Sequence, residues 1–166
     1  MIVRYHISFK SSFGWIRPVS DGAALIRLDW DQLPWRESDH PDNVSRETMR
    51  QLQAYFAGEL TSFDLPLNPE GTSDAAKMWL NAMAKIPYGE TMTYGDFAAL
   101  AGKPMAARAA GSACANNPIP IIYPCHRVVR ADGKLGSYGG GSQLPPSSPE
   151  NLQRKADLIA LEKNQL

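Results

Sequence analysis

The chain has 166 residues and no net charge, with 17 Lys and Arg against 17 Asp and Glu, and 43% of its residues are hydrophobic. This size and composition fit one domain or two small ones around a buried core, and they exclude a disordered chain. No apolar run reaches the roughly 18 residues of a membrane span. The opening residues, MIVRYHISFK, lack the apolar stretch of a signal peptide. We therefore expect a cytoplasmic protein that does not bind membranes.

The first part of the chain predicts a small α/β unit. Three stretches, with the turn signal SDG between the last two, have the composition of short strands: residues 1–9, 13–20 and 23–30. Apolar residues at helical spacing predict a helix over 43–57, which Gly58 ends. Residues 61–73 are rich in proline and polar residues and look like a linker or a strand leading into one. No residue of this part suggests chemistry.

The second part of the chain is predicted to be helical. Ser73 can cap a first helix, Thr93 can cap a second over 94–101, and 105–117 form a third. A tight turn that contains glycine joins the last two helices. This pattern fits a helix-turn-helix, whose second helix usually meets DNA, or a plain helical hairpin.

Charge and side-chain size single out the third predicted helix. Residues 1–74 carry a net charge of −4 and residues 75–135 carry +4, which hints at an anionic partner such as nucleic acid. Within 105–117 most residues are Ala, Gly or Ser, and Arg108 is the only charged one. A helix without bulk suits either tight packing in a core or a narrow groove of DNA with Arg108 projecting near the helix start.

Cys125 has a neighbour that could make it reactive. It lies in IIYPCHRVV beside His126, and an imidazole can lower the pKa of a nearby thiol. Neighbours in an extended segment point to opposite sides, so we expect a bridging water to relay the proton. The alternative is a buried structural thiol beside a chance histidine. The other cysteine is Cys114, and two cysteines fit a reducing compartment and supply no zinc site.

The stretch IPYGETMTYGDFAALAGKPMAARAAGSACANNPIPIIYPCHRVVRADGKLGSYGGG closely resembles the O6-alkylguanine-DNA alkyltransferases, the methylated-DNA–protein-cysteine methyltransferases. PCHRV is the active-site signature of that family. The match is nearly continuous over 73–141 and resumes in the last dozen residues. The resemblance implies a ribonuclease-H-like α/β domain over 1–68, followed by a mostly helical, winged-helix-like domain with a DNA-binding helix-turn-helix over 69–166.

The resemblance also implies a DNA repair activity and its residues. The protein would bind duplex DNA containing O6-alkylguanine by the minor groove through 105–116, flip the damaged base, and take its alkyl group once and irreversibly. O4-alkylthymine is a further candidate substrate. The catalytic residues would be the nucleophile Cys125, the proton acceptor His126, its partner Glu162, and Tyr94, which helps flipping and protonates the leaving base. The residues that bind DNA or the base would be the finger Arg108, Gly111 and Ser112 of the helix, the turn brace Asn117, and Val128 and Tyr138 at the base edges.

The resemblance implies no cofactor and no metal, and we expect a monomer. Some relatives hold zinc in the first domain, but the cysteines and histidines here cannot supply that site. The link GGGSQLPPSSPENL is longer than the family's usual connection to its last helix. Residues 139–150 are therefore either a solvated insertion or a cover over the mouth of the pocket.

Two other classes of function compete with alkyl transfer. A protein that recognises alkylated guanine without repairing it would replace the cysteine, and Cys125 is present. A cysteine hydrolase would need a separate histidine and an oxyanion loop, and neither is evident. The residues therefore favour alkyl transfer.

Overall fold

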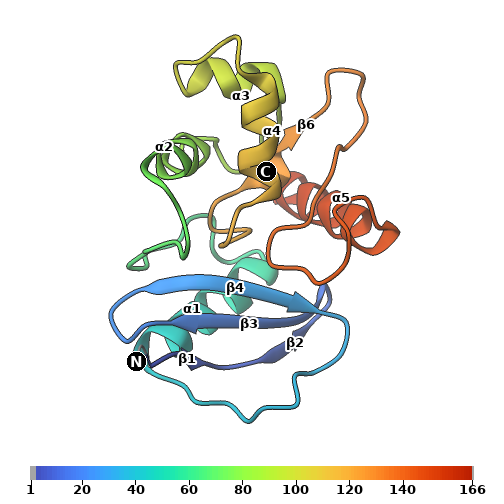
Figure 1. Cartoon of the computed structure of the whole chain (residues 1–166). Coiled ribbons are helices and arrows are strands. Elements are labelled where there is room, and N and C mark those ends of the chain that lie inside the picture. The colour runs from blue at the N-terminus through green and yellow to red at the C-terminus, as the bar shows by residue number, and fades with distance from the viewer. Residues whose placement is uncertain (1–2, 166) are drawn as a thin grey trace.

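The computed structural model describes residues 3–165, in which a small sheet with one helix lies against a cluster of helices (Figure 1). The sheet contains β1 (Tyr5–His6), β2 (Phe9–Ser11), β3 (Gly14–Ser20) and β4 (Leu25–Asp31). The central strand is β3, which pairs antiparallel with β1 and β2 along one edge and with β4 along the other. The predicted helix forms α1 (Asn43–Phe56), which packs against β3 and β4.

The single strand predicted over residues 1–9 is wrong. The structure divides it into β1 and β2, and residues 1–2 lie outside the described part of the chain. The division falls at Ser8, whose backbone N–H and hydroxyl both donate to Asp39 Oδ1, at 2.9 and 3.1 Å. Because the carboxylate takes these donors, the chain leaves the ladder between the two short strands.

The second part of the chain has the predicted helical character. Its elements are α2 (Asp74–Met83), β5 (Met92–Thr93), α3 (Tyr94–Leu100), α4 (Ala107–Ala115), the 3-10 turn η1 (Cys125–Arg127), β6 (Val128–Val129) and α5 (Pro149–Asn164). Ser73 and Thr93 cap α2 and α3 as predicted, and α3 packs against α4 in the helix-turn-helix arrangement. No helix within residues 3–165 is long and apolar enough to cross a membrane.

Helix α4 is shorter than the 105–117 predicted for it. Its start is delayed because the Ala106 N–H donates to Lys103 O at 2.9 Å and closes a turn through Pro104 and Met105. Pro is favoured at the second position of such a turn, since its ring presets φ. The turn therefore holds the residues just before α4 in a fixed conformation.

The outer edge of β4 joins the two parts of the molecule. Backbone N–H groups of β4 donate to carbonyls outside the sheet: Leu25 to Pro66 at 2.8 Å, Leu28 to Pro118 at 2.9 Å, and Trp30 to Gly141 at 2.8 Å. Unpaired strand edges invite association with other chains, and here Pro66 of the first part and Pro118 and Gly141 of the second part cover the edge. The sheet thus contacts the backbone that follows α4 and the loop that precedes α5.

That loop, predicted over 139–150, has most of residues 143–150 exposed but is anchored to the rest of the molecule. It ends at Ser148, whose side chain caps α5. Besides the contact of Gly141 with β4, Tyr138 N–H donates to Pro146 O at 2.9 Å and Asn151 Nδ2 to Pro145 O at 3.0 Å. The loop is therefore tied to the sheet and to both of its own ends. Its role as a cover over the pocket stays a prediction.

Candidate active site around Cys125

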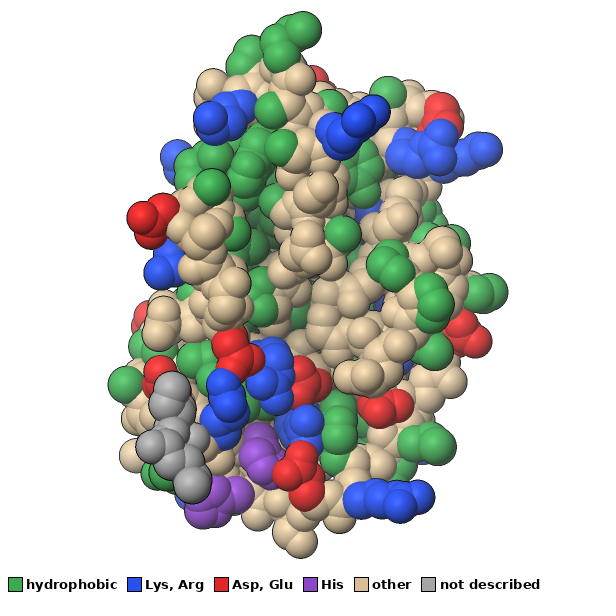
Figure 2. Space-filling model, viewed as in Figure 1, with side chains coloured by type: hydrophobic (Ala, Val, Ile, Leu, Met, Phe, Trp, Pro, Cys, Tyr) green, Lys and Arg blue, Asp and Glu red, His purple; other side chains and the backbone are tan. Residues whose placement is uncertain are grey.

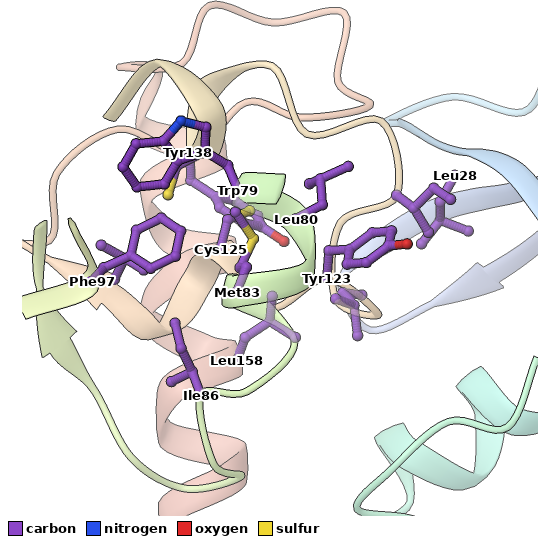
Figure 3. Close-up of a cluster of buried hydrophobic side chains, with 14 of the residues drawn as sticks. Leu28, Trp79, Leu80, Met83, Ile86, Phe97, Tyr123, Cys125, Tyr138 and Leu158 are labelled. Carbon is purple, nitrogen blue, oxygen red and sulfur yellow. The ribbon is translucent and has the colours of Figure 1, made fainter. Parts of the chain in front are cut away.

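Cys125 lies in the core of the helical part of the molecule and is only 2% exposed. Figure 3 shows it among the side chains of Trp79, Met83, Phe97, Tyr138 and Leu158. The extended conformation expected here is wrong, because the Arg127 N–H donates to Pro124 O at 3.0 Å and forms η1. Successive side chains of a 3-10 turn still point about 120° apart. The side chains of Cys125 and His126 therefore point in different directions, as expected, but because of the 3-10 turn and not because of an extended segment.

Asn117 connects the end of α4 to Cys125. Its Nδ2 donates to Tyr123 O at 2.8 Å and to Cys125 Sγ at 3.2 Å, while its Oδ1 accepts from the Ile119 N–H at 3.0 Å. Burial raises the pKa of the Cys125 thiol, and the hydrogen bond from Asn117 and the charge of Lys155 act against this rise. The resting state is therefore a protonated thiol whose sulfur already has one hydrogen-bond donor.

His126 is fully buried and faces Glu162. Its Nε2 lies 2.6 Å from Glu162 Oε2, and its Nδ1 has no hydrogen-bond partner among residues 3–165. Burial lowers the pKa of His126, although the carboxylate opposes that effect. A neutral imidazole that donates from Nε2 has its lone pair on Nδ1. This nitrogen is thus available to accept a proton.

Glu162, on α5, accepts hydrogen bonds from distant parts of the chain. Besides His126, it accepts from Tyr55 Oη at 2.6 Å, from Arg127 Nε and Nη2 at 2.8 and 3.0 Å, and from the Gly89 N–H at 3.1 Å. Burial opposes ionisation, but these hydrogen bonds hold the pKa of Glu162 well below its ordinary value. An ionised carboxylate so well satisfied orients His126 rather than taking up a proton itself.

Tyr94, at the start of α3, is packed between two glycines. A Cβ at Gly111 of α4 would lie 3.9 Å from its ring, and a Cβ at Gly136 would lie 2.7 Å from its hydroxyl. Burial, with a smaller contribution from Cys114 and Cys125, raises the pKa of Tyr94 to about 12. Its hydroxyl therefore keeps its proton at neutral pH and is a hydrogen-bond donor.

The remaining predicted site residues divide between the core and the surface. Tyr138 is buried, and its hydroxyl has no partner among the described residues. Val128 lies in β6, where its N–H donates to Cys125 O. The Cys125 carbonyl has a second lone pair for a base edge, whereas the Val128 N–H could donate to a base only by giving up this hydrogen bond. Arg108 and Ser112 lie on the exposed side of α4, outside the buried cluster.

Sequence reasoning missed several side chains of the site. Tyr55 comes from the first part of the chain, and no local pattern marks it. Arg127 lies inside the PCHRV motif, but it was not assigned to Glu162. Lys155 is fully buried, and its Nζ donates to Leu135 O at 2.5 Å and to Ser137 O at 3.3 Å. It precedes Glu162 by seven residues, two helical turns, and this spacing was a usable signal.

Two family models match nearly the whole chain. The ribonuclease-like domain of 6-O-methylguanine DNA methyltransferase matches residues 4–69, and the DNA-binding domain of the same family matches residues 74–164. These matches confirm the resemblance and the fold class predicted from the sequence.

Individual relatives agree with the family models. A protein of Methanosarcina acetivorans named methylated-DNA–protein-cysteine methyltransferase is 58% identical over 148 residues, covering 84% of this chain and 92% of its own. A relative of the same name in Mycobacterium leprae is 43% identical and covers 96% and 92%.

Solved structures agree as well. The O6-methylguanine methyltransferase of Mycobacterium tuberculosis superposes with a TM-score of 0.80 at 39% identity, over 99% of this chain and 95% of that one. The M. tuberculosis protein in complex with DNA superposes with a TM-score of 0.79 at 40% identity, over 96% and 93%. The chain therefore belongs to the 6-O-methylguanine DNA methyltransferase family.

Proposed function

We propose that the protein repairs DNA by direct reversal, moving an alkyl group from O6-alkylguanine in duplex DNA to Cys125. The observation that carries this proposal is a buried thiol that accepts a hydrogen bond from Asn117 and is followed in the chain by a histidine paired with an ionised carboxylate. In this proposal residues 1–68 form a supporting domain, residues 69–166 carry the chemistry, and the protein works as a monomer.

The first step is activation of the thiol. His126 Nδ1 accepts the proton of Cys125 through a bridging water, since the two side chains diverge. The resulting imidazolium is stabilised by Glu162, which accepts its Nε2–H at 2.6 Å. Asn117 and Lys155 stabilise the thiolate, because both already favour the charged form of the sulfur.

The second step is a direct displacement. The thiolate attacks the alkyl carbon, the new C–S bond forms, and the bond between that carbon and guanine O6 breaks. Tyr94 donates its proton to a ring nitrogen, so that neutral guanine leaves. The thioether is stable, so each molecule reacts once.

The DNA-facing side of the proposal rests on α4. Its exposed surface bears Arg108 and Ser112, while Gly111 faces the Tyr94 ring and lets α4 pack close to the start of α3. Arg108 fills the space that the flipped base leaves, and the phosphates attract the basic second part of the chain. Tyr138 and the backbone of Val128 then contact the base. Because Cys125 is 2% exposed, the wall of the pocket has to move before the base reaches Sγ.

The stoichiometry of transfer tests this function. The protein is incubated with excess duplex containing O6-methylguanine, and its intact mass and peptides are measured. We expect a plateau at one methyl group, mapped to Cys125 and absent in Cys125→Ala. The matched control is Cys114→Ala, which removes the other buried cysteine and should retain transfer. Continued turnover, or a label on Cys114, would contradict the proposal.

A further inference from the structure

Met105 is an apolar side chain placed almost wholly in water. It is 97% exposed, while Leu33, the next most exposed large hydrophobic residue among the described residues, is 72% exposed. The turn that precedes α4 fixes its backbone, because the hydrogen bond from Ala106 N–H to Lys103 O encloses Pro104 and Met105. A single exposed apolar side chain is common on protein surfaces. A closed turn holds this one outward directly before α4, where a partner of that helix can reach it.

The surroundings of Met105 identify the chemistry of that partner. Lys103 lies two residues before it and the exposed Arg108 three residues after it, and residues 101–117 include no Asp or Glu. Figure 2 shows the same combination at the upper end of the molecule, over the α3–α4 turn, where hydrophobic atoms protrude above Lys and Arg side chains. A basic surface with one apolar projection fits a polyanion that has apolar walls.

The exposed side of α4 continues this surface. Ala107, Arg108, Ala109 and Ser112 are all exposed and, apart from Arg108, small. Met105 precedes Arg108 by three residues and lies in the turn that leads directly into α4. It therefore lies at the edge of the surface that carries the proposed finger residue.

We propose that Met105 is a minor-groove contact, whose side chain packs on the deoxyribose and base edges beside the flipped nucleotide. The inference rests on the function proposed above. Apolar side chains, methionine among them, serve as wedges in proteins that bind the minor groove. The flexible, polarizable thioether adapts to an irregular wall. A second copy of the chain fits less well, because a symmetric contact would bring Lys103 and Arg108 against their own copies.

The test compares Met105→Ala and Met105→Gln with Leu33→Ala, a matched exposed apolar residue in the first part of the chain. Affinity for a duplex with O6-methylguanine is measured at several salt concentrations. We expect both Met105 variants to bind roughly five- to tenfold more weakly, since each loses most of the apolar contact. The dependence of affinity on salt should keep its slope, because no phosphate contact is lost. Leu33→Ala should bind like the wild type.

A second readout separates DNA binding from chemistry. The rate of transfer from duplex at low protein concentration should fall more in Met105→Ala than the rate from free O6-benzylguanine, which has no groove. Unchanged affinity, or an equal loss in Leu33→Ala, would overturn the inference. A dimer detected by sedimentation that disappears in Met105→Ala would overturn it in favour of a second copy.

Transfer by the wild-type protein shows whether a negative result concerns only the Met105 contact or the proposed function as a whole. If the wild type methylates Cys125 from duplex while the Met105 variants bind equally well, only the groove contact is wrong. If the wild type transfers nothing, the proposed function is wrong, and the affinity comparison still decides whether Met105 touches DNA.

Discussion

Replacing Tyr55 by Phe should lower the free energy of unfolding, because the Tyr55 hydroxyl bonds to Glu162, more than a hundred residues away in sequence. The Tyr55 hydroxyl donates to Glu162 Oε2 at 2.6 Å, across a separation of 107 residues, and both side chains are buried. Phe keeps the ring and its packing against Phe56 and Phe63. The substitution therefore removes one hydrogen bond between the two parts of the molecule and opens no cavity.

The size of the effect follows from what the carboxylate retains. A hydrogen bond to a charged group contributes about 1.5–3 kcal/mol. Oε2 still accepts from His126 and Arg127 in Tyr55→Phe, so it is not left unsatisfied. We therefore expect the lower end, about 1.5–2 kcal/mol of unfolding free energy, which for a chain of this size lowers Tm by about 3–8 °C.

Urea unfolding at pH 7 measures this loss, and Tyr88→Phe is the matched control. Tyr88 lies beside Tyr55, and its buried hydroxyl has no partner among residues 3–165. Its removal should change the unfolding free energy by less than about 0.5 kcal/mol. The reasoning is refuted if Tyr55→Phe is as stable as Tyr88→Phe, because the hydroxyl would then contribute nothing through Glu162.

Two further predictions concern the same domain contact and the carboxylate. The pKa of Glu162 is depressed in the folded state, so its contribution to stability is complete above the ordinary value of 4.5 and is lost as pH falls below it toward the folded pKa. Wild-type unfolding free energy should therefore fall below that pH. Glu162→Gln, which leaves the buried Arg127 without a charged partner, should be about 3–5 kcal/mol less stable at pH 7 and should lack this part of the acid dependence. It should also transfer alkyl groups more slowly, because His126 loses its charged partner. A variant with the wild-type acid profile would show that another group causes it. Gly141→Ala should cost more than Gly133→Ala in urea unfolding: both glycines have positive φ, but a Cβ at Gly141 would meet Leu28 O while one at Gly133 would meet nothing within 4 Å. We expect a difference of about 1–3 kcal/mol, and equal losses would show that the contact with β4 is unimportant.

Sequence reasoning succeeded where the signal is local. Ser73 and Thr93 mark helix starts because an N-cap acts within three residues, and their side chains accept from Ala76 and Asp96 N–H groups. The motif around Cys125 was recognisable because its residues are contiguous. Glu162 came from the resemblance, and the structure places it against His126 although the connecting loop is long.

The failures arise where distant contacts decide. Asp39 divides the first predicted strand from thirty-one residues away. The extended segment expected at Cys125 becomes a turn, although flanking apolar residues are typical of a strand. The contact of Tyr55 with Glu162 exists only after the two domains pack together. Local propensity contains none of this information, because tertiary packing determines which hydrogen bonds are available.

The burial of Cys125 also affects how fast the thiol is oxidised. A thiol that serves once is lost as surely by oxidation as by repair, and oxidants attack the exposed thiolate far faster than the buried thiol. At 2% exposure and with its pKa raised by burial, Cys125 meets neither condition in the free protein. The free protein should therefore lose its single equivalent of reactivity to oxidants only slowly.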